Sequence, residues 1–213
     1  MSGTLYIDFD GTLHNTGRIY EEALTNVVLE MEKRGWIKDV NIKEKKVQKY
    51  LGWKREEMWD DFLEELSREQ KVQGSQWLGE KMMEEYDRSP NCLYPNVPEV
   101  LKECKKKGYT LVFLSNCSRH YRDKVREKYH LEEYFDEFLC AEDFPGKTKG
   151  EIIEETKENF PPGVAVIGDR HHDMEGAKEH GLLPIFCTYG FGEKEEGEGC
   201  IAISSFKEVL DHV

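Results

Sequence analysis

An excess of positive charge is lacking in this chain. The 30 Lys and Arg residues are outnumbered by 43 Asp and Glu residues, which gives a formal net charge of -13 at pH 7. Nucleic acids and anionic membrane surfaces both attract basic footprints, so this balance argues against either of them as a partner. It does not exclude a small phosphorylated molecule, because a metal ion and a few local cations reverse the sign of the charge inside one cleft.

Long apolar runs are also lacking. No run approaches the ~20 residues that a helix needs to cross a bilayer, and the N-terminus enters a strand pattern without the features of a signal peptide. The cysteines are scattered and form no C-x-x-C pair, which disfavours a zinc site and fits a reducing compartment. They are Cys92, Cys104, Cys117, Cys140, Cys187 and Cys200. We therefore expect a cytoplasmic protein.

Short apolar segments recur along the chain and alternate with helical patterns. The segments are 4–8, 109–115, 137–140, 164–168 and 184–187. Strands that alternate with helices predict right-handed crossovers and a parallel sheet covered on both faces. The expected fold class is therefore α/β, with a Rossmann-like three-layer core. The acidic, glycine-rich stretch 193–199 is expected to be a solvated loop.

One part of the chain breaks this alternation. Between residues 15 and 90 the apolar positions have helix spacing, and no strand run intervenes. This pattern predicts an all-helical block that is inserted after the first strand, and the proline-rich run 93–98 marks the return to the sheet. The expected division is a core of residues 1–14 and 91–213 and a helical cap of residues 15–90.

Two carboxylates lie one residue apart at the end of the first strand, in Asp8-Phe9-Asp10-Gly11-Thr12. A glycine after Asp10 lets the backbone turn, so that both acids project at the carboxyl edge of the sheet, where open α/β folds bind ligands. Two such close acids repel each other unless they share a cation or one of them holds a proton. The pair therefore indicates a divalent metal site, an acid–base couple, or both.

Polar residues follow the ends of three other predicted strands or lie just beyond them. They are Ser115-Asn116, the Lys147/Lys149 region, and Gly168-Asp169-Arg170-His171-His172-Asp173. A parallel sheet gathers its strand ends at one edge, so these residues are expected to surround a single site with Asp8 and Asp10.

This combination suits phosphoryl transfer. Asp8 would be the nucleophile that forms an aspartyl-phosphate, and Asp10 would act first as an acid and then as a base. Asp8 and Asp169 would hold Mg²⁺, a cation that prefers carboxylate oxygens. Ser115 would donate to a phosphoryl oxygen, with Asn116 or backbone N–H groups helping. A lysine would add positive charge, and Asp173 would orient that lysine or a metal-bound water.

These motifs resemble those of the haloacid dehalogenase superfamily, in its phosphatase branch. The resemblance rests on Asp8-Phe9-Asp10-Gly11-Thr12, on Ser115, and on Gly168 to Ala177, which is similar to a G-D-R-x-x-D motif followed by G-A. It implies Asp8 as nucleophile, Asp10 as acid and base, and Mg²⁺ held by Asp8, the Asp10 backbone carbonyl and Asp169. It also favours Lys149 over Lys147, because the lysine of this family directly precedes a helix.

Several finer expectations follow from the resemblance. The segment Tyr189-Gly190-Phe191-Gly192 resembles a loop of phosphoglycolate-phosphatase-like members. In related caps, a loop near residues 51–55 selects the substrate, so Arg55 or Lys54 would contact a second anionic group; the alternative is that this segment is a solvated surface turn. Thr12 would help to bind the phosphate. His171 and His172 occupy variable positions of their motif, and we expect them to face solvent.

The sequence thus predicts a Mg²⁺-dependent phosphatase that acts on a small, phosphoglycolate-like phosphomonoester, as a monomer or a homodimer. A phosphomutase similar to β-phosphoglucomutase, a pyrophosphatase and a 5′-nucleotidase are alternatives among enzymes. Outside enzymes, a receiver-like phospho-accepting module or a binding protein would use similar residues. A receiver domain has no place for a ~75-residue helical insertion, judged by usual domain sizes.

Overall fold

A computed structural model describes residues 3–42, 47–51, 53 and 55–213, without the side chains of residues 55 and 56. The chain divides into two compact units. The core unit comprises Met1–Asn15 and Leu93–Val213, and the helical unit comprises Thr16–Cys92. In the part of the chain that is described, no helix is both long and apolar enough to cross a membrane.

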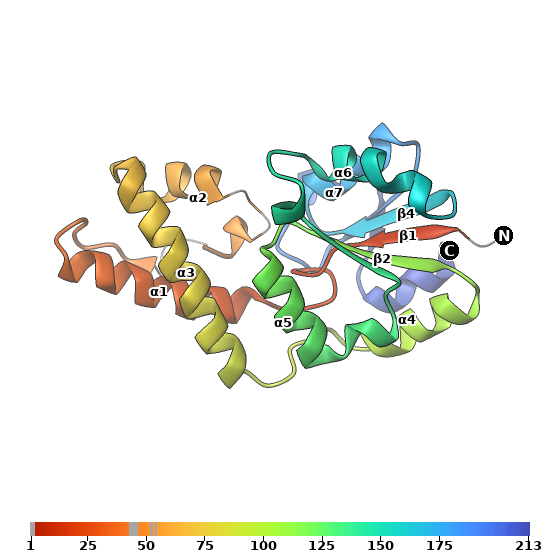
Figure 1. Cartoon of the computed structure of the whole chain (residues 1–213), viewed down its shortest axis with the longest axis horizontal. Coiled ribbons are helices and arrows are strands. Elements are labelled where there is room, and N and C mark those ends of the chain that lie inside the picture. Colours follow the sequence, from red (N-terminus) through yellow and green to blue (C-terminus); the bar gives the residue numbers. More distant parts are fainter. Residues whose placement is uncertain (1–2, 43–46, 52, 54) are drawn as a thin grey trace. The chain divides into compact units, whose positions relative to one another are not determined.

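The core unit is built on one sheet of six parallel strands, in the order β3-β2-β1-β4-β5-β6 (Figure 1). The strands are β1 (Thr4–Ile7), β2 (Thr110–Ser115), β3 (Glu137–Cys140), β4 (Gly163–Gly168), β5 (Leu183–Cys187) and β6 (Ile201–Ile203). The first five agree with the predicted apolar segments to within a residue at each end. The central position of β1 places the residues that follow it in the middle of the carboxyl edge.

Helices cover both faces of the sheet, with α6 and α7 on one side and α4 and α5 on the other (Figure 1). Their bounds are α4 (Val97–Lys106), α5 (Arg119–Tyr129), α6 (Lys149–Thr156) and α7 (His171–Glu179). On the α6–α7 side, Tyr6, Val112 and Val166 of neighbouring strands pack with Ile152 and Ala177 in one buried cluster. The three-layer α/β core that the sequence predicts is confirmed.

Short 3-10 helices complete the core unit. They are η3 (Leu131–Glu133), η4 (Ala141–Asp143), η5 (Lys157–Asn159), η6 (Lys194–Gly197) and η7 (Phe206–Asp211). The helix η6 corrects the expectation of a solvated loop at 193–199, because the Glu196 side chain is only 15% exposed and binds Arg170 and His171.

The described part of the helical unit contains helices and no strand. These are α1 (Gly17–Lys33), η2 (Val47–Tyr50), α2 (Arg55–Phe62) and α3 (Arg68–Arg88). A capping box of Ser67 and Gln70 begins α3. A Cβ atom at Gly74 would lie 2.4 Å from Cε of Met31 and 3.0 Å from the Trp59 ring, so this glycine lets α3 approach both side chains closely. The helical insertion expected after the first strand is therefore present.

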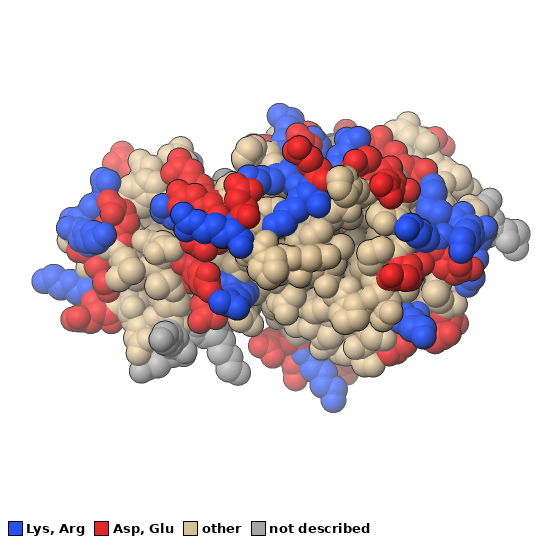
Figure 2. Space-filling view, turned by 90° about the horizontal axis from the view of Figure 1, so that it is seen from below, with Lys and Arg blue, Asp and Glu red and all other residues tan. Residues whose placement is uncertain are grey.

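The surface carries both signs of charge. On the face drawn in Figure 2, the Lys and Arg side chains lie among Asp and Glu side chains over both units. This mixture accompanies the net charge of -13 of the whole chain.

Candidate active site

The turn after β1 is held by its own backbone. The Asp8 N–H donates to the Ile167 carbonyl over 2.9 Å, which fixes Asp8 beside β4. The Phe9 carbonyl accepts hydrogen bonds from the N–H groups of Thr12, Leu13 and His14. Gly11 has a φ of +84°, a conformation that a glycine adopts without strain. The turn therefore carries Asp8 and Asp10 at the carboxyl edge of the sheet, as predicted.

Lys149 connects two of the predicted acids. Its Nζ atom lies 2.7 Å from Asp8 Oδ1 and 2.5 Å from Asp173 Oδ1, and all three side chains are buried. Thr148 caps α6 in a capping box with Glu151, which makes Lys149 the first residue of the helix. Lys147 instead pairs with Glu155 and keeps 39% of its side chain exposed. Between the two candidate lysines, only Lys149 reaches Asp8.

Asp173 is fixed by a second contact at the start of α7. Its Oδ2 accepts a hydrogen bond from the Arg170 backbone N–H over 3.1 Å. A Cβ atom at Gly168 would lie 2.1 Å from Asp173 Cγ, so the last residue of β4 leaves no room for a side chain there. Both oxygens of Asp173 are thus engaged with protein donors.

Asp169 is fully buried between β4 and α7. The Phe191 N–H donates to its Oδ2 over 2.6 Å. Its Oδ1 finds no hydrogen-bond partner among the residues that the structure describes. A buried carboxylate oxygen without a partner is costly, unless a cation coordinates it or it takes up a proton.

The segment Tyr189–Gly192 wraps around Asp169. A Cβ atom at Gly190 would lie 2.3 Å from the Asp169 Cβ atom, and one at Gly192 would lie 1.8 Å from the Asp169 carbonyl oxygen. Gly11 closes the other side, because its Cβ atom would lie 2.1 Å from Asp169 Oδ2. Three glycines therefore allow the backbone to surround this one carboxylate.

Burial shapes the charges at this site. Desolvation raises the pKa of Asp8 to about 7, although Lys149 opposes the shift. Desolvation, with the neighbouring charge of Asp8, also raises the pKa of Asp169. For Lys149, burial acts to lower the pKa, but Asp173 and Asp8 outweigh it and raise the value above normal. The cluster thus holds one firmly charged cation among three carboxyl groups.

This donor set fits a hard divalent cation. Carboxylate oxygens of Asp8, Asp169 and Asp173 lie within 4.8 Å of one another, and Mg²⁺ prefers such oxygens and keeps several waters. Asp8 and the partnerless Oδ1 of Asp169 are the natural ligands, since both Asp173 oxygens already accept hydrogen bonds. The residues present therefore fit Mg²⁺.

Asp10 has a partner that the sequence did not indicate. The Tyr121 hydroxyl donates to Asp10 Oδ1 over 2.7 Å from the first turn of α5. Tyr121 lies in a polar stretch that follows the predicted strand 109–115, and that stretch does not reveal which side chain faces the turn after β1. The proximity of Tyr121 to Ser115 in the sequence was the signal available.

The other predicted residues are distributed as follows. Ser115 is the last residue of β2 and is buried, and Asn116 follows it in a half-buried position. Thr12 is fully buried in the turn after β1, where its carbonyl accepts a hydrogen bond from the Tyr189 hydroxyl over 2.8 Å. Arg55 begins α2, and its side chain and the whole of Lys54 lie outside the described residues.

Comparison with known proteins identifies the family. The chain belongs to the haloacid dehalogenase-like hydrolases, whose family model matches residues 4–181. This confirms the resemblance seen in the motifs. The match spans both units, and it includes every residue discussed at this site before the segment Tyr189–Gly192.

Two relatives and one solved structure illustrate the similarity. The chain is 29% identical over 128 residues to a phosphoglycolate phosphatase of Vibrio vulnificus, an alignment that covers 57% of this chain and 56% of that protein. It is 24% identical to a phosphoglycolate phosphatase of Aquifex aeolicus, over 88% of this chain and 85% of that one. The crystal structure of a predicted phosphatase from Clostridium acetobutylicum superimposes with a TM-score of 0.79 at 21% identity, and covers 99% of this chain and 100% of the other.

Proposed function

We propose that this chain is a Mg²⁺-dependent phosphatase that hydrolyses a small phosphorylated metabolite through an aspartyl-phosphate on Asp8. The observation that carries the proposal is the buried bridge of Lys149 between Asp8 and Asp173, beside Asp169. A buried cation that orients one carboxylate, next to a second with a partnerless oxygen, suits a site that receives both a metal ion and a phosphoryl group.

In the first step, an oxygen of Asp8 attacks phosphorus, and the bond from phosphorus to the leaving oxygen breaks. Asp10 donates a proton to that leaving oxygen, so that the alcohol departs neutral. Tyr121 holds the Asp10 carboxyl group in position through its hydrogen bond to Oδ1.

In the second step, Asp10 takes a proton from a water molecule that attacks the phosphorus of the aspartyl-phosphate. The bond between phosphorus and the Asp8 oxygen breaks, and inorganic phosphate leaves as the Asp8 carboxylate is restored. Ser115 and Asn116 donate hydrogen bonds to the phosphoryl oxygens throughout, and Thr12 supports the turn that carries both acids.

Mg²⁺, held by Asp8, the Asp10 carbonyl and Asp169, would neutralise charge on the transferring phosphoryl group. Lys149 orients Asp8 and favours its charged form, and Asp173 in turn orients Lys149. These contacts place one fixed positive charge where the phosphoryl group would add negative charge.

The substrate class comes from the relatives. Both curated relatives described above are phosphoglycolate phosphatases, so we propose a phosphoglycolate-like phosphomonoester as the first substrate to test. The helical unit would serve as the cap that selects it, with Arg55 as the candidate contact for a second anionic group.

The test is phosphate release from 2-phosphoglycolate, sugar phosphates, nucleoside 5′-monophosphates and pyrophosphate, with Mg²⁺ or with EDTA. Release that requires Mg²⁺, favours one or two compounds and disappears in Asp8→Asn would support the proposal. Asp211→Asn, an exposed change of the same kind, should act as wild type. Failure of the folded, Mg²⁺-supplied protein to release phosphate from any compound would contradict the proposal.

A further inference from the structure

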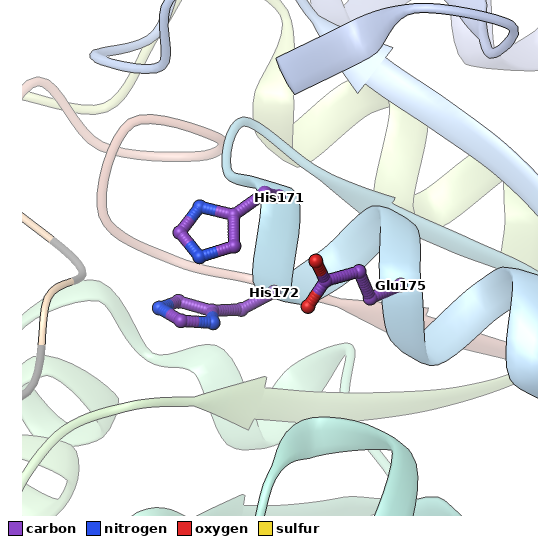
Figure 3. Close-up of side chains that lie close together, drawn as sticks. All are labelled: His171, His172 and Glu175. Atoms are coloured by element: carbon purple, nitrogen blue, oxygen red, sulfur yellow. The ribbon is translucent and has the colours of Figure 1, made fainter.

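A second group of side chains that could hold a metal ion lies in the first half of α7. His171, His172 and Glu175 each offer a ligand atom, and these atoms lie within 4.8 Å of one another. Figure 3 shows the Glu175 carboxylate turned toward the two imidazole rings, with both histidines in the first turn of α7 and Glu175 one turn further along. The sequence spacing explains why Glu175 lies near both histidines, because residues three and four apart in a helix are neighbours on its surface.

The two rings are close to each other. Their centroids are 3.8 Å apart with an interplanar angle of 45°. His171 and His172 are half-buried and Glu175 is exposed, so the group is open to solvent on one side. This arrangement differs from the expectation that both histidines simply face solvent.

The orientation of His171 is set by Glu196. Oxygen Oε2 of Glu196 lies 2.9 Å from His171 Nδ1 and also accepts a hydrogen bond from the His171 backbone N–H over 2.8 Å. A carboxylate only accepts, so Nδ1 carries the proton and Nε2 is the nitrogen left for a metal. Glu196 is itself held by Arg170 Nε at 3.1 Å.

A carboxylate on the far nitrogen of a metal-bound histidine is a recurring feature of protein metal sites. It fixes the tautomer and the ring orientation, and it makes the other nitrogen a stronger ligand. A bond between His171 and Glu196 alone would explain the position of one ring. It would not explain why a second imidazole and another carboxylate converge on the same point.

From this geometry we propose that His171, His172 and Glu175 form a site for a divalent transition-metal ion such as Zn²⁺, Co²⁺ or Ni²⁺. Two imidazoles and one carboxylate suit these ions, whereas the all-oxygen group around Asp8 and Asp169 suits Mg²⁺. Three protein ligands leave positions for water on the exposed side. The site is separate from the phosphatase proposal and does not depend on it.

The test is titration of the full chain with Co²⁺ in saturating Mg²⁺, followed by visible absorption and calorimetry. Mg²⁺ keeps the carboxylate site filled, and a Co²⁺ spectrum distinguishes nitrogen and oxygen ligands from thiolate ligands. We expect one Co²⁺ per chain with a nitrogen–oxygen spectrum. The double variant H171A/H172A should lose this binding, and His120→Ala, a change at an exposed histidine of α5, should retain it.

Two further variants sharpen the result. Glu175→Gln removes one ligand from an exposed position. It therefore tests whether Co²⁺ binds at this site even if the double variant does not fold. Glu196→Gln should weaken binding by about 10- to 100-fold, as expected for the loss of an orienting carboxylate. Circular dichroism checks the fold of each variant. Absence of Co²⁺ binding in the presence of Mg²⁺, a thiolate spectrum, or unchanged binding in H171A/H172A and Glu175→Gln would overturn the proposal.

Discussion

The Tyr121 hydroxyl donates a hydrogen bond to Asp10 Oδ1 over 2.7 Å and so joins α5 to the turn that follows β1. Tyr121→Phe removes only that hydroxyl. A single hydrogen bond to a carboxylate contributes about 1.5–3 kcal/mol, so we expect kcat to fall by roughly tenfold or more, with little change in KM. Steady-state kinetics would test this. Tyr134→Phe, a buried tyrosine at the end of η3, should leave kcat unchanged.

Lys149 and Lys147 form a matched pair for a stability test. Lys149→Met leaves the buried Asp8 and Asp173 without their shared cation, and we expect a loss of about 3–5 kcal/mol in the free energy of unfolding without Mg²⁺. Lys147→Met removes a pair that is well exposed, and should change this free energy by about 0.5 kcal/mol or less. Urea unfolding measures both, and equal effects would refute the assigned difference between the lysines.

A substitution at Gly190 tests whether the close packing of the backbone around Asp169 matters for metal binding. In Gly190→Ala the new Cβ atom would lie 2.3 Å from Asp169 Cβ and must displace it. We expect the affinity for Mg²⁺ to fall by about tenfold or more, as for a disturbed metal ligand. The shift of the thermal midpoint on adding Mg²⁺ reports this affinity.

The control for that variant is Gly79→Ala, where a Cβ atom meets nothing within 4 Å inside α3. It should stabilise the helix slightly, because alanine favours helix by about 1 kcal/mol over glycine, and leave the response to Mg²⁺ intact. If Gly190→Ala also responds to Mg²⁺ as wild type does, the enclosure has no role in metal binding.

The burial of His14 is expected to make the stability of the protein depend on pH. It is fully buried and stacks on Phe9, and its Nε2 lies 2.9 Å from the Tyr129 hydroxyl. Burial, aided by Lys128, lowers its pKa to about 3. The unfolded chain therefore binds a proton below about pH 6.5 that the folded protein does not bind, and stability is lost as the pH falls.

The contribution of His14 to this loss is up to about 1.4 kcal/mol per pH unit below the unfolded pKa. His14→Phe keeps an aromatic ring in the stack and removes the titration. We expect its free energy of unfolding to decline less steeply than that of wild type from neutral pH to about pH 5. His120→Ala should keep the wild-type slope. Parallel slopes for wild type and His14→Phe would show that His14 does not govern the acid response.

Much of the site could be predicted because its residues lie where an apolar run of the sequence ends and polar residues begin. An apolar run that ends in Asp8 or in Gly168-Asp169 marks both a buried strand and the edge where ligands bind. Parallel pairing then gathers these ends whatever the length of chain between them. Lys149 was separated from Lys147 by the family resemblance, and the structure gives the physical reason, since only Lys149 begins α6 and reaches Asp8.

Other features left little trace in the sequence. The strand β6 has three residues, one of them exposed, which is too short for a recognisable pattern. Tyr121 and Glu196 lie in charged, polar stretches, and their contacts with Asp10 and His171 depend on tertiary packing rather than on local spacing. For the same reason the glycine-rich segment 193–199 suggested a loop, although η6 anchors Glu196 against α7.

The proposed mechanism requires that Asp8 becomes phosphorylated during turnover. Its most direct test is intact-mass and peptide mass spectrometry of the Mg²⁺-supplied protein, quenched with acid within the first turnover of the best substrate from the panel. We predict one phosphoryl group on the peptide that carries Asp8, absent from Asp8→Asn and present in Asp211→Asn. Turnover without any phosphorylated protein, or phosphorylation and turnover that persist in Asp8→Asn, would contradict the proposed mechanism.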